Sequence, residues 1–153
     1  MTNTYFDFED GNGPVPAHQH SNGGGWVADT ATVADTAYVG QDAQVFGYAE
    51  LDGNAKVYGY AEVYGDAKVF GYAVVDDYAK VYDYAKVYGD ATVSGDATVS
   101  GDATVSGNAR VSGNAHVGGN AHVGGNEPSK EQPEKDRIFI NGKWYVEEVE
   151  GDE

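Results

Sequence analysis

Residues 89–112 read GDATVSGDATVSGDATVSGNARVS, in which six residues occur three times unchanged and a fourth time with two substitutions. A core built from assorted shapes does not need such repetition, so exact repeats indicate one structural unit stacked on copies of itself. The spacing extends far beyond this stretch. Valine recurs at every sixth position from Val27 to Val123, with Leu51 as the one exception, which gives seventeen hexads without insertion or deletion.

Each position of the hexad has a physical role. Alanine lies two residues before the aliphatic residue from Ala31 to Ala121, and glycine usually lies two residues after it. In the A-x-V segment, alanine and valine point to one side of a short strand and the residue between them points to the other. Glycine, followed by Asp, Asn or Tyr, supplies a turn. The pattern therefore predicts a short strand and a corner in every hexad, because a period of six does not keep one face on an α-helix.

The pattern resembles that of the hexapeptide-repeat family over residues 25–126. The variant A-x-V-[YSF]-G-[DN], with a leader such as NGGGWVADTATV, is similar to hexapeptide-repeat proteins of bacteria and tailed phages. The resemblance implies an all-β fold, a single-stranded left-handed parallel β-helix that winds three hexads into each triangular coil. Seventeen hexads then make a triangular solenoid of about six coils. The left hand is implied by the resemblance and not by the periodicity.

The flanks of the solenoid differ from it in composition. We expect residues 1–24, rich in Gly and Pro, to form an irregular N-terminal leader or cap, and residues 127–137 to form a charged linker. Residues 138–153 contain two apolar runs about Asn141-Gly142 and predict a β-hairpin that caps the solenoid or contacts another subunit. The predicted capping residues are Trp26, Ile138, Ile140, Trp144 and Val146.

The chain is strongly acidic and contains no cysteine. It has 9 Lys and Arg against 25 Asp and Glu, a formal net charge of −16. Such a surface repels nucleic acid and anionic membranes and favours a partner with a basic surface. No apolar run approaches the ~20 residues of a membrane span, and the N-terminus does not resemble a secretory signal. We expect no direct nucleic-acid or membrane binding, and a location in the cytoplasm or in a particle assembled there.

Residues eighteen apart become stacked neighbours if three hexads make one coil. This places Glu50 beside Lys68 and Glu62 beside Lys80, pairs that would fix the register by ~0.2–1 kcal/mol each.

Aromatic residues gather on the outward positions of the middle coils, most densely along one edge. Stacking that stiffens a thin solenoid would explain them, but exposed clusters of Tyr and Phe are typical of interfaces. Family precedent implies a homo-oligomer, with a trimer favoured. The predicted interaction residues are Phe46, Tyr48, Tyr58, Tyr64, Phe70, Tyr82, Tyr84 and Tyr88.

The function that we expect is that of a non-enzymatic, rigid interaction or structural module acting by protein–protein contacts through this exposed aromatic belt. Phage-encoded virion parts, assembly scaffolds and inhibitors that cover a host protein belong to this class. An alternative is an acidic nucleic-acid mimic that blocks a DNA- or RNA-binding protein. Residues 26–126 carry 13 acids and 5 bases, a net −8, about half the ~16 charges of duplex DNA over the same height.

A further alternative is an acyltransferase, because hexapeptide acyltransferases use a histidine as general base in a cleft between subunits. The seventeen hexads carry no inserted loop, and His18 and His20 lie in the leader. His116 and His122 are six residues apart and would diverge from adjacent faces, which argues against a zinc site like that of the carbonic anhydrases of this fold. We therefore expect no catalytic residue, no metal and no cofactor, although a metal at the leader histidines stays an open question.

Overall fold

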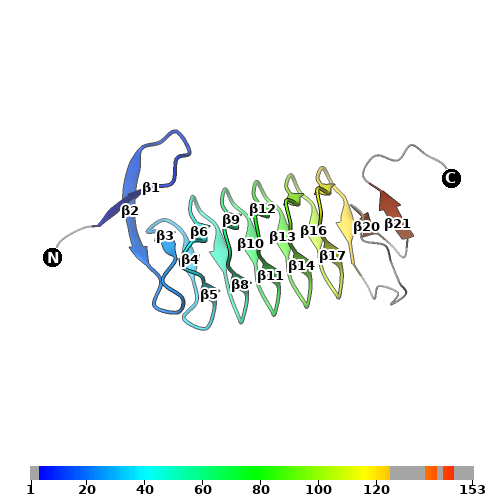
Figure 1. Cartoon of the computed structure of the whole chain (residues 1–153), viewed down its shortest axis with the longest axis horizontal. Coiled ribbons are helices and arrows are strands. Elements are labelled where there is room, and N and C mark those ends of the chain that lie inside the picture. Colours follow the sequence, from blue (N-terminus) through cyan, green and yellow to red (C-terminus); the bar gives the residue numbers. More distant parts are fainter. Residues whose placement is uncertain (1–3, 125–136, 141–142, 147–153) are drawn as a thin grey trace.

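The computed structural model describes residues 4–124 and the backbone of residues 137–140 and 143–146. Within these residues the protein is all-β. Short strands wind into coils that stack along the long axis of the molecule (Figure 1). Seventeen of the strands, β3 to β19, correspond one to one to the seventeen hexads, so the predicted β-solenoid is confirmed. No helix that could cross a bilayer occurs in the part of the chain that the structure describes.

Three parallel sheets form the sides of the solenoid, and each strand pairs with the strand eighteen residues further along the chain. The first sheet contains β3 (Trp26–Ala28), β6 (Gln44–Val45), β9 (Glu62–Val63), β12 (Lys80–Val81), β15 (Thr98–Val99) and β18 (His116–Val117). The second sheet contains β4 (Thr32–Val33), β7 (Glu50–Leu51), β10 (Lys68–Val69), β13 (Lys86–Val87), β16 (Thr104–Val105) and β19 (His122–Val123). The third sheet contains β5 (Tyr38–Val39), β8 (Lys56–Val57), β11 (Val74–Val75), β14 (Thr92–Val93) and β17 (Arg110–Val111).

These sheets of six, six and five strands make between five and six coils, close to the predicted number. The left-handed winding stays a prediction of the resemblance. Backbone hydrogen bonds join each coil to the next: the N–H of Lys56 donates to Ala73 O at 2.9 Å, and the N–H of Tyr38 donates to Ala55 O at 2.9 Å. Because paired strands are parallel, each strand both donates to and accepts from its neighbours in the adjacent coils.

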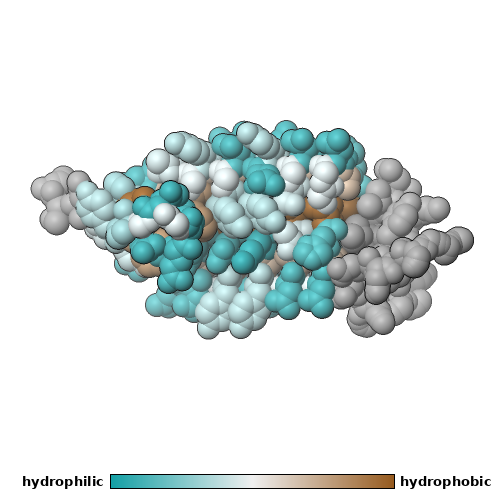
Figure 2. Space-filling model, turned by 90° about the horizontal axis from the view of Figure 1, so that it is seen from above, coloured by the Kyte–Doolittle hydropathy of each residue, from teal (hydrophilic) through white to brown (hydrophobic). Residues whose placement is uncertain are grey.

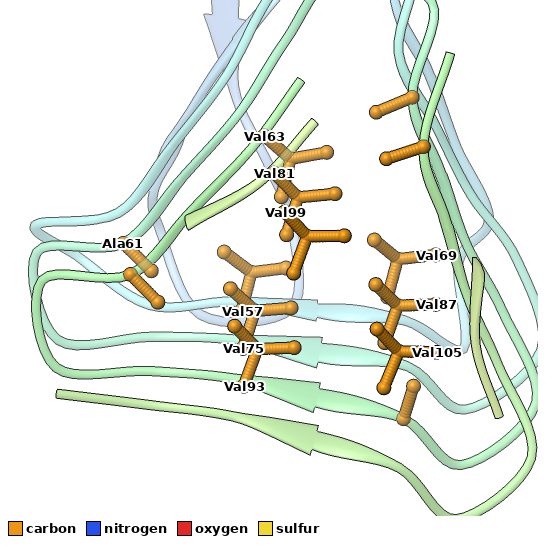
Figure 3. Packing of buried hydrophobic residues seen from close by; sticks show 14 of the residues in the cluster. Val57, Ala61, Val63, Val69, Val75, Val81, Val87, Val93, Val99 and Val105 are labelled. Carbon is orange, nitrogen blue, oxygen red and sulfur yellow. The ribbon is translucent and has the colours of Figure 1, made fainter. Parts of the chain in front are cut away.

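The core is a column of valine and alanine. Figure 3 shows valines of the three sheets as three stacked rows that point toward one another, for example Val63, Val57 and Val69 at one level. These three side chains are fully buried. Full burial of a side chain of this size contributes ~1.5–3 kcal/mol, so the regular six-residue spacing supplies most of the driving force for winding. The buried alanines lie at the corners, where the sheets meet and only a small side chain fits.

The corners require a left-handed backbone. Gly95 has a φ of +66°, and a Cβ added to it would lie 2.9 Å from the backbone nitrogen of Gly113 in the next coil. Glycine avoids both the unfavourable dihedral and this contact. Two coil corners nevertheless carry an aspartate in the left-handed region, Asp77 with φ 60° and Asp83 with φ 64°.

The prediction of an irregular leader is wrong for residues 5–7 and 14–19, which form strands. β1 (Tyr5–Asp7) and β2 (Pro14–Gln19) form an antiparallel hairpin, and β2 continues the first sheet by pairing with β3 (Figure 1). The hairpin forms because Phe8 and Ala17 bury their side chains against Ala28 and Phe46 of the first coils.

At the other end, β20 (Arg137–Ile140) and β21 (Lys143–Val146) form the predicted antiparallel hairpin, and β20 lies close to β17 and β19 of the last coils (Figure 1). The predicted capping residues Ile138, Ile140, Trp144 and Val146 belong to these strands, but their side chains lie outside the described residues.

Candidate functional site

The outward residues form vertical rows because coils stack with an eighteen-residue step. One row on each sheet comes from the residue before the core valine, and two rows at each corner come from the first and third residues after it. These rows carry nearly all the side-chain chemistry of the described residues. On the face drawn in Figure 2, the surface is mainly hydrophilic or neutral in hydropathy, with small hydrophobic areas between the rows.

The longest aromatic row lies at the corner between the first and second sheets. Phe46 stacks on Tyr64 with ring centroids 4.8 Å apart, and Tyr64 stacks on Tyr82 at 5.0 Å, both with nearly parallel planes. Burial raises the pKa of Tyr64 to about 12, and nearby Tyr82 adds to the shift. The structure thus brings together three of the predicted interaction residues as one stack.

The N-terminal hairpin extends this stack. Phe8 stacks on Phe46 at 4.7 Å, and Phe6 contacts both Phe8 and Trp26 at 4.7 Å. Phe46 is consequently only 5% exposed, so its prediction as an exposed interaction residue is wrong. The sequence signal for this contact was the pair of phenylalanines in the leader, but nothing in their spacing related them to the hexads.

Two further stacks lie at the other corners. Phe70 stacks on Tyr88 at 4.8 Å between the second and third sheets, and Tyr60 stacks on Tyr78 at 5.2 Å between the third and first sheets. Phe70 and Tyr88 are half-buried, whereas Tyr60 and Tyr78 are exposed. The aromatic residues are therefore shared among all three corners, although the longest stack does follow one edge.

The most exposed tyrosines project from the third position after the core valine. Tyr48 and Tyr84 belong to the same corner, two coils apart, with Asp66 between them. Tyr72 occupies the equivalent place at the second corner. These three rings take no part in the aromatic stacks described above, so they stay available to a partner or ligand.

An aromatic patch lies on the third sheet. Tyr38 and Tyr58 contact edge to face with centroids 6.5 Å apart, and with Lys56 they line a hollow of about 330 Å³. Val74, partly exposed, continues the outward row of Tyr38 and Lys56. We call Tyr38, Tyr58 and Val74 the third-sheet patch. Sequence reasoning identified Tyr58 and missed Tyr38, because it considered aromatic residues after the core valine and not before it.

Asp76 lies in the row of Tyr58, one coil further along. Its pKa is raised, mainly because it is partly buried and also because Asp77 is nearby, while hydrogen bonding with Tyr58 acts in the opposite direction. The Asp76 Oδ1 atom is buried without a hydrogen-bond partner. The charged form of this carboxyl is therefore disfavoured in the folded protein.

We expect the Asp76→Asn variant to be more stable than the wild type at neutral pH. The pKa of Asp76 is higher in the folded protein than its unfolded value of 3.8, so ionisation of this carboxyl favours the unfolded state. The free energy of unfolding is therefore unaffected by this ionisation below pH 3.8 and falls as the pH rises through the folded pKa. The advantage of the variant should therefore grow from about pH 4 to pH 7 in urea unfolding curves. Asp90→Asn, at an exposed corner, controls for loss of one charge. A difference from wild type that does not change with pH would contradict the prediction.

The histidines do not converge. His18 Nδ1 lies 2.7 Å from Asp29 Oδ1, and His20 is buried with Nε2 2.9 Å from Ala37 O. His116 and His122 lie on the first and second sheets, on different sides of the solenoid, as their spacing predicted. Within the described residues, no group of three or more His, Cys, Asp or Glu side chains could hold a metal ion.

Two shallow grooves run along the solenoid, each between a corner row and a sheet row. The second-sheet groove has a volume of about 470 Å³, and its predicted register pair Glu50 and Lys68 forms an ion pair with 3.5 Å between Nζ and Oε1. The first-sheet groove has a volume of about 440 Å³ and contains Glu62 and Lys80, which are in register; no ion pair joins them within 4.0 Å in the described part. The grooves expose charge and aromatic rings together.

The family model described as the YdcK beta solenoid repeat matches the chain over residues 85–101, 93–107 and 103–119. The matched region covers residues 85–119, less than half of the chain, and includes the GDATVS repeats. No curated protein and no solved structure matches the chain. The match and the stacked parallel coils together identify the chain as a repeat β-solenoid protein.

Proposed function

We propose that this protein is a non-enzymatic, rigid interaction module of the hexapeptide-repeat type, which binds protein partners through exposed aromatic side chains. The observation that carries the proposal is the third-sheet patch, where Tyr38 and Tyr58 stand exposed or half-exposed on a sheet that the core holds rigid. Tyrosine is enriched at interfaces because it offers a large amphipathic surface and loses little conformational entropy. The first partner in this proposal is a second copy of the chain, in a homotrimer.

Rigidity supports this function. Nearly every hexad buries its aliphatic residue and the alanine two residues before it, and the coils are bonded to one another along three sheets. A partner that binds the patch therefore meets side chains whose backbone is already ordered, which reduces the entropic cost of association.

The charges around the patch indicate what a partner would offer. Asp76 and Asp77 lie at the corner that follows the third sheet, one coil beyond Tyr58. The chain as a whole has a formal net charge of −16. Lys56 is the basic group that lines the hollow beside Tyr38 and Tyr58. A complementary surface would be apolar at its centre with basic residues at one side, because opposite charges at a rim accelerate encounter and select the partner.

The test is a double variant, Tyr38→Ser with Tyr58→Ser, measured for mass in solution by analytical ultracentrifugation. We expect a trimeric mass for the wild type and a monomeric mass for the variant, with an unchanged circular dichroism spectrum because the core valines are untouched. Tyr5→Ser, an exposed tyrosine in the N-terminal hairpin, is the matched control and should stay trimeric. A monomeric wild type, or a variant with wild-type mass, would contradict self-association through this patch.

A further inference from the structure

Two sets of four residues repeat with the same placement on neighbouring sides of the solenoid. The second-sheet groove holds Tyr84, Lys86, Asp102 and Thr104, and the first-sheet groove holds Tyr78, Lys80, Asp96 and Thr98. In each set the sequence Tyr-Ala-Lys lies one coil before Asp-Ala-Thr, and the lysine is in register with the threonine. The two sets are related by one six-residue step, so the solenoid presents one arrangement of side chains twice.

The backbone of the two sets also matches. The N–H groups of Tyr78 and Tyr84 donate to Gly95 O and Gly101 O, both at 2.9 Å. The N–H groups of Asp96 and Asp102 donate to the carbonyls of Gly113 and Gly119, both at 2.8 Å. Equal backbone distances mean that the four side chains start from equivalent positions in the two grooves.

The left-handed aspartates mark the same two places. Asp77 precedes Tyr78 and accepts a hydrogen bond from Gly95 N–H at 3.1 Å, and Asp83 precedes Tyr84 and accepts one from Gly101 N–H at 3.0 Å. Elsewhere in the solenoid portion of the described residues, the positive-φ corner residues are glycines. Backbone strain in non-glycine residues concentrates at functional sites. In each set the left-handed aspartate lies next to the tyrosine and is hydrogen-bonded to the following coil, which carries the groove aspartate, Asp96 or Asp102.

The third side of the solenoid lacks these features and provides an internal comparison. There Tyr72 lies one coil before Asp90 and Thr92, but Val74 replaces the lysine and Gly71 replaces the left-handed aspartate. Tyr72 is 64% exposed, against 59% for Tyr78 and 62% for Tyr84. Exposure of the tyrosine is therefore the same on all three sides, while the lysine and the aspartate bridge occur together on two.

We propose that each of the two grooves binds a pyranose unit of a neutral glycan, at a place separate from the third-sheet patch. The C–H face of a sugar ring packs against the exposed ring of Tyr84, or against the face of the Tyr78 ring that is not stacked on Tyr60. The lysine donates hydrogen bonds, the aspartate accepts them and the threonine does both, which suits neighbouring sugar hydroxyls. With all of its charged lining residues, each groove has one more acidic than basic side chain, which disfavours an anionic ligand.

The size and direction of the grooves fit this class of ligand. Volumes of about 470 and 440 Å³ lie in the range of small-molecule sites. In the second-sheet groove, Tyr48 and Tyr84 lie on one corner two coils apart, ~9.6 Å from the strand spacing, with Asp66 between them. A linear oligosaccharide lying along the axis contacts both rings in succession. The acidic chain, at −16, disfavours an anionic polysaccharide.

The experiment is titration calorimetry of the full chain with maltohexaose, cellohexaose and chitohexaose, and with hexagalacturonate as the anionic comparison. We expect at least one neutral hexasaccharide to bind with two equivalents per chain. Tyr78→Ala and Tyr84→Ala should each weaken one site by at least ~10-fold, and the double variant should weaken both. Tyr72→Ala, the matched control on the third side, should keep two sites. Melting curves establish that all variants are folded.

A second pair of variants tests the aspartate bridge as a positioning element. Asp77→Gly keeps a residue suited to the left-handed backbone but loses the hydrogen bond to Gly95, so it should weaken the Tyr78 site alone. Asp77→Asn retains an acceptor oxygen and tolerance of the left-handed region, so it should restore binding. Equal binding by Asp77→Gly and wild type would overturn the positioning role.

Three results would overturn the glycan proposal. The first is no binding tighter than ~1 mM by any of the neutral hexasaccharides. The second is equal or tighter binding of hexagalacturonate. The third is a Tyr78→Ala, Tyr84→Ala double variant that binds as the wild type does. If the double variant loses self-association and the wild type binds no glycan, the grooves are protein contacts instead. Because the third-sheet patch is varied in a separate experiment, the two proposals fail independently.

Discussion

Replacement of Val57 by aspartate is expected to abolish cooperative folding. Val57 is fully buried in the third sheet, between Val39 and Val75 of the adjacent coils. A carboxylate there has no partner in a column of valine and alanine, and the cost of burying it, about 5 kcal/mol or more, is comparable with the whole stability of a small domain. Because each coil contacts only its neighbours, a coil that cannot close also interrupts the stack.

The control for this variant is its immediate neighbour. Lys56 lies one residue earlier and points outward, so Lys56→Asp changes the charge more than Val57→Asp does but leaves the core intact. Urea unfolding followed by circular dichroism should show a normal transition for Lys56→Asp and no folded baseline for Val57→Asp. A folded Val57→Asp protein with wild-type midpoint would mean that the column is not the source of stability.

Deletion of residues 89–106 is expected to leave a folded, shorter solenoid. These eighteen residues are three complete hexads, so removal joins Tyr88 to Gly107 and keeps both the six-residue phase and the order of the three sheets. Stability should fall, because a solenoid is stabilised by the sum of its repeats and their interfaces. The transition should nevertheless remain cooperative.

A shorter deletion should be far more damaging. Removal of residues 89–97 takes out nine residues and leaves three residues from Val87 to the next valine in place of six. Three residues cannot form both a strand and a corner, so the coils on the two sides of the junction cannot stack in register. Circular dichroism and limited proteolysis would compare the two proteins. Equal protection of the nine- and eighteen-residue deletions would show that hexad phase does not control stacking.

The fold was readable from the sequence because its determinants are local and repeated. The interval of six from Val27 to Val123 determines which side chains are inside, and the eighteen-residue step gives the register that pairs Lys68 with Glu50. The hairpin at the N-terminus was not readable in this way. Pro14 and Pro16 in β2 argue against a strand, and only contacts with the first coils stabilise it.

The candidate site was predictable in part for the same reason. Periodicity placed the tyrosines outside and aligned the stack of Tyr64 and Tyr82. It did not show that Phe8 covers Phe46, because a leader with no repeat gives no register. Nor did it show Asp77 bonded to the next coil, since that hydrogen bond depends on a backbone conformation which glycine usually occupies.

The parallel stacking of coils makes each side of the solenoid a ladder with one strand direction. In the described residues the second and third sheets end at β4 and β5 on one side and at β19 and β17 on the other, so a strand edge remains at each end. Two such ladders joined head to tail would continue the parallel sheets, and nothing in that geometry would stop at two, so a filament could grow. The hairpins β1–β2 and β20–β21 lie at the two ends of the ladder (Figure 1). Their placement opposes chain-to-chain growth and keeps the molecule at a finite length.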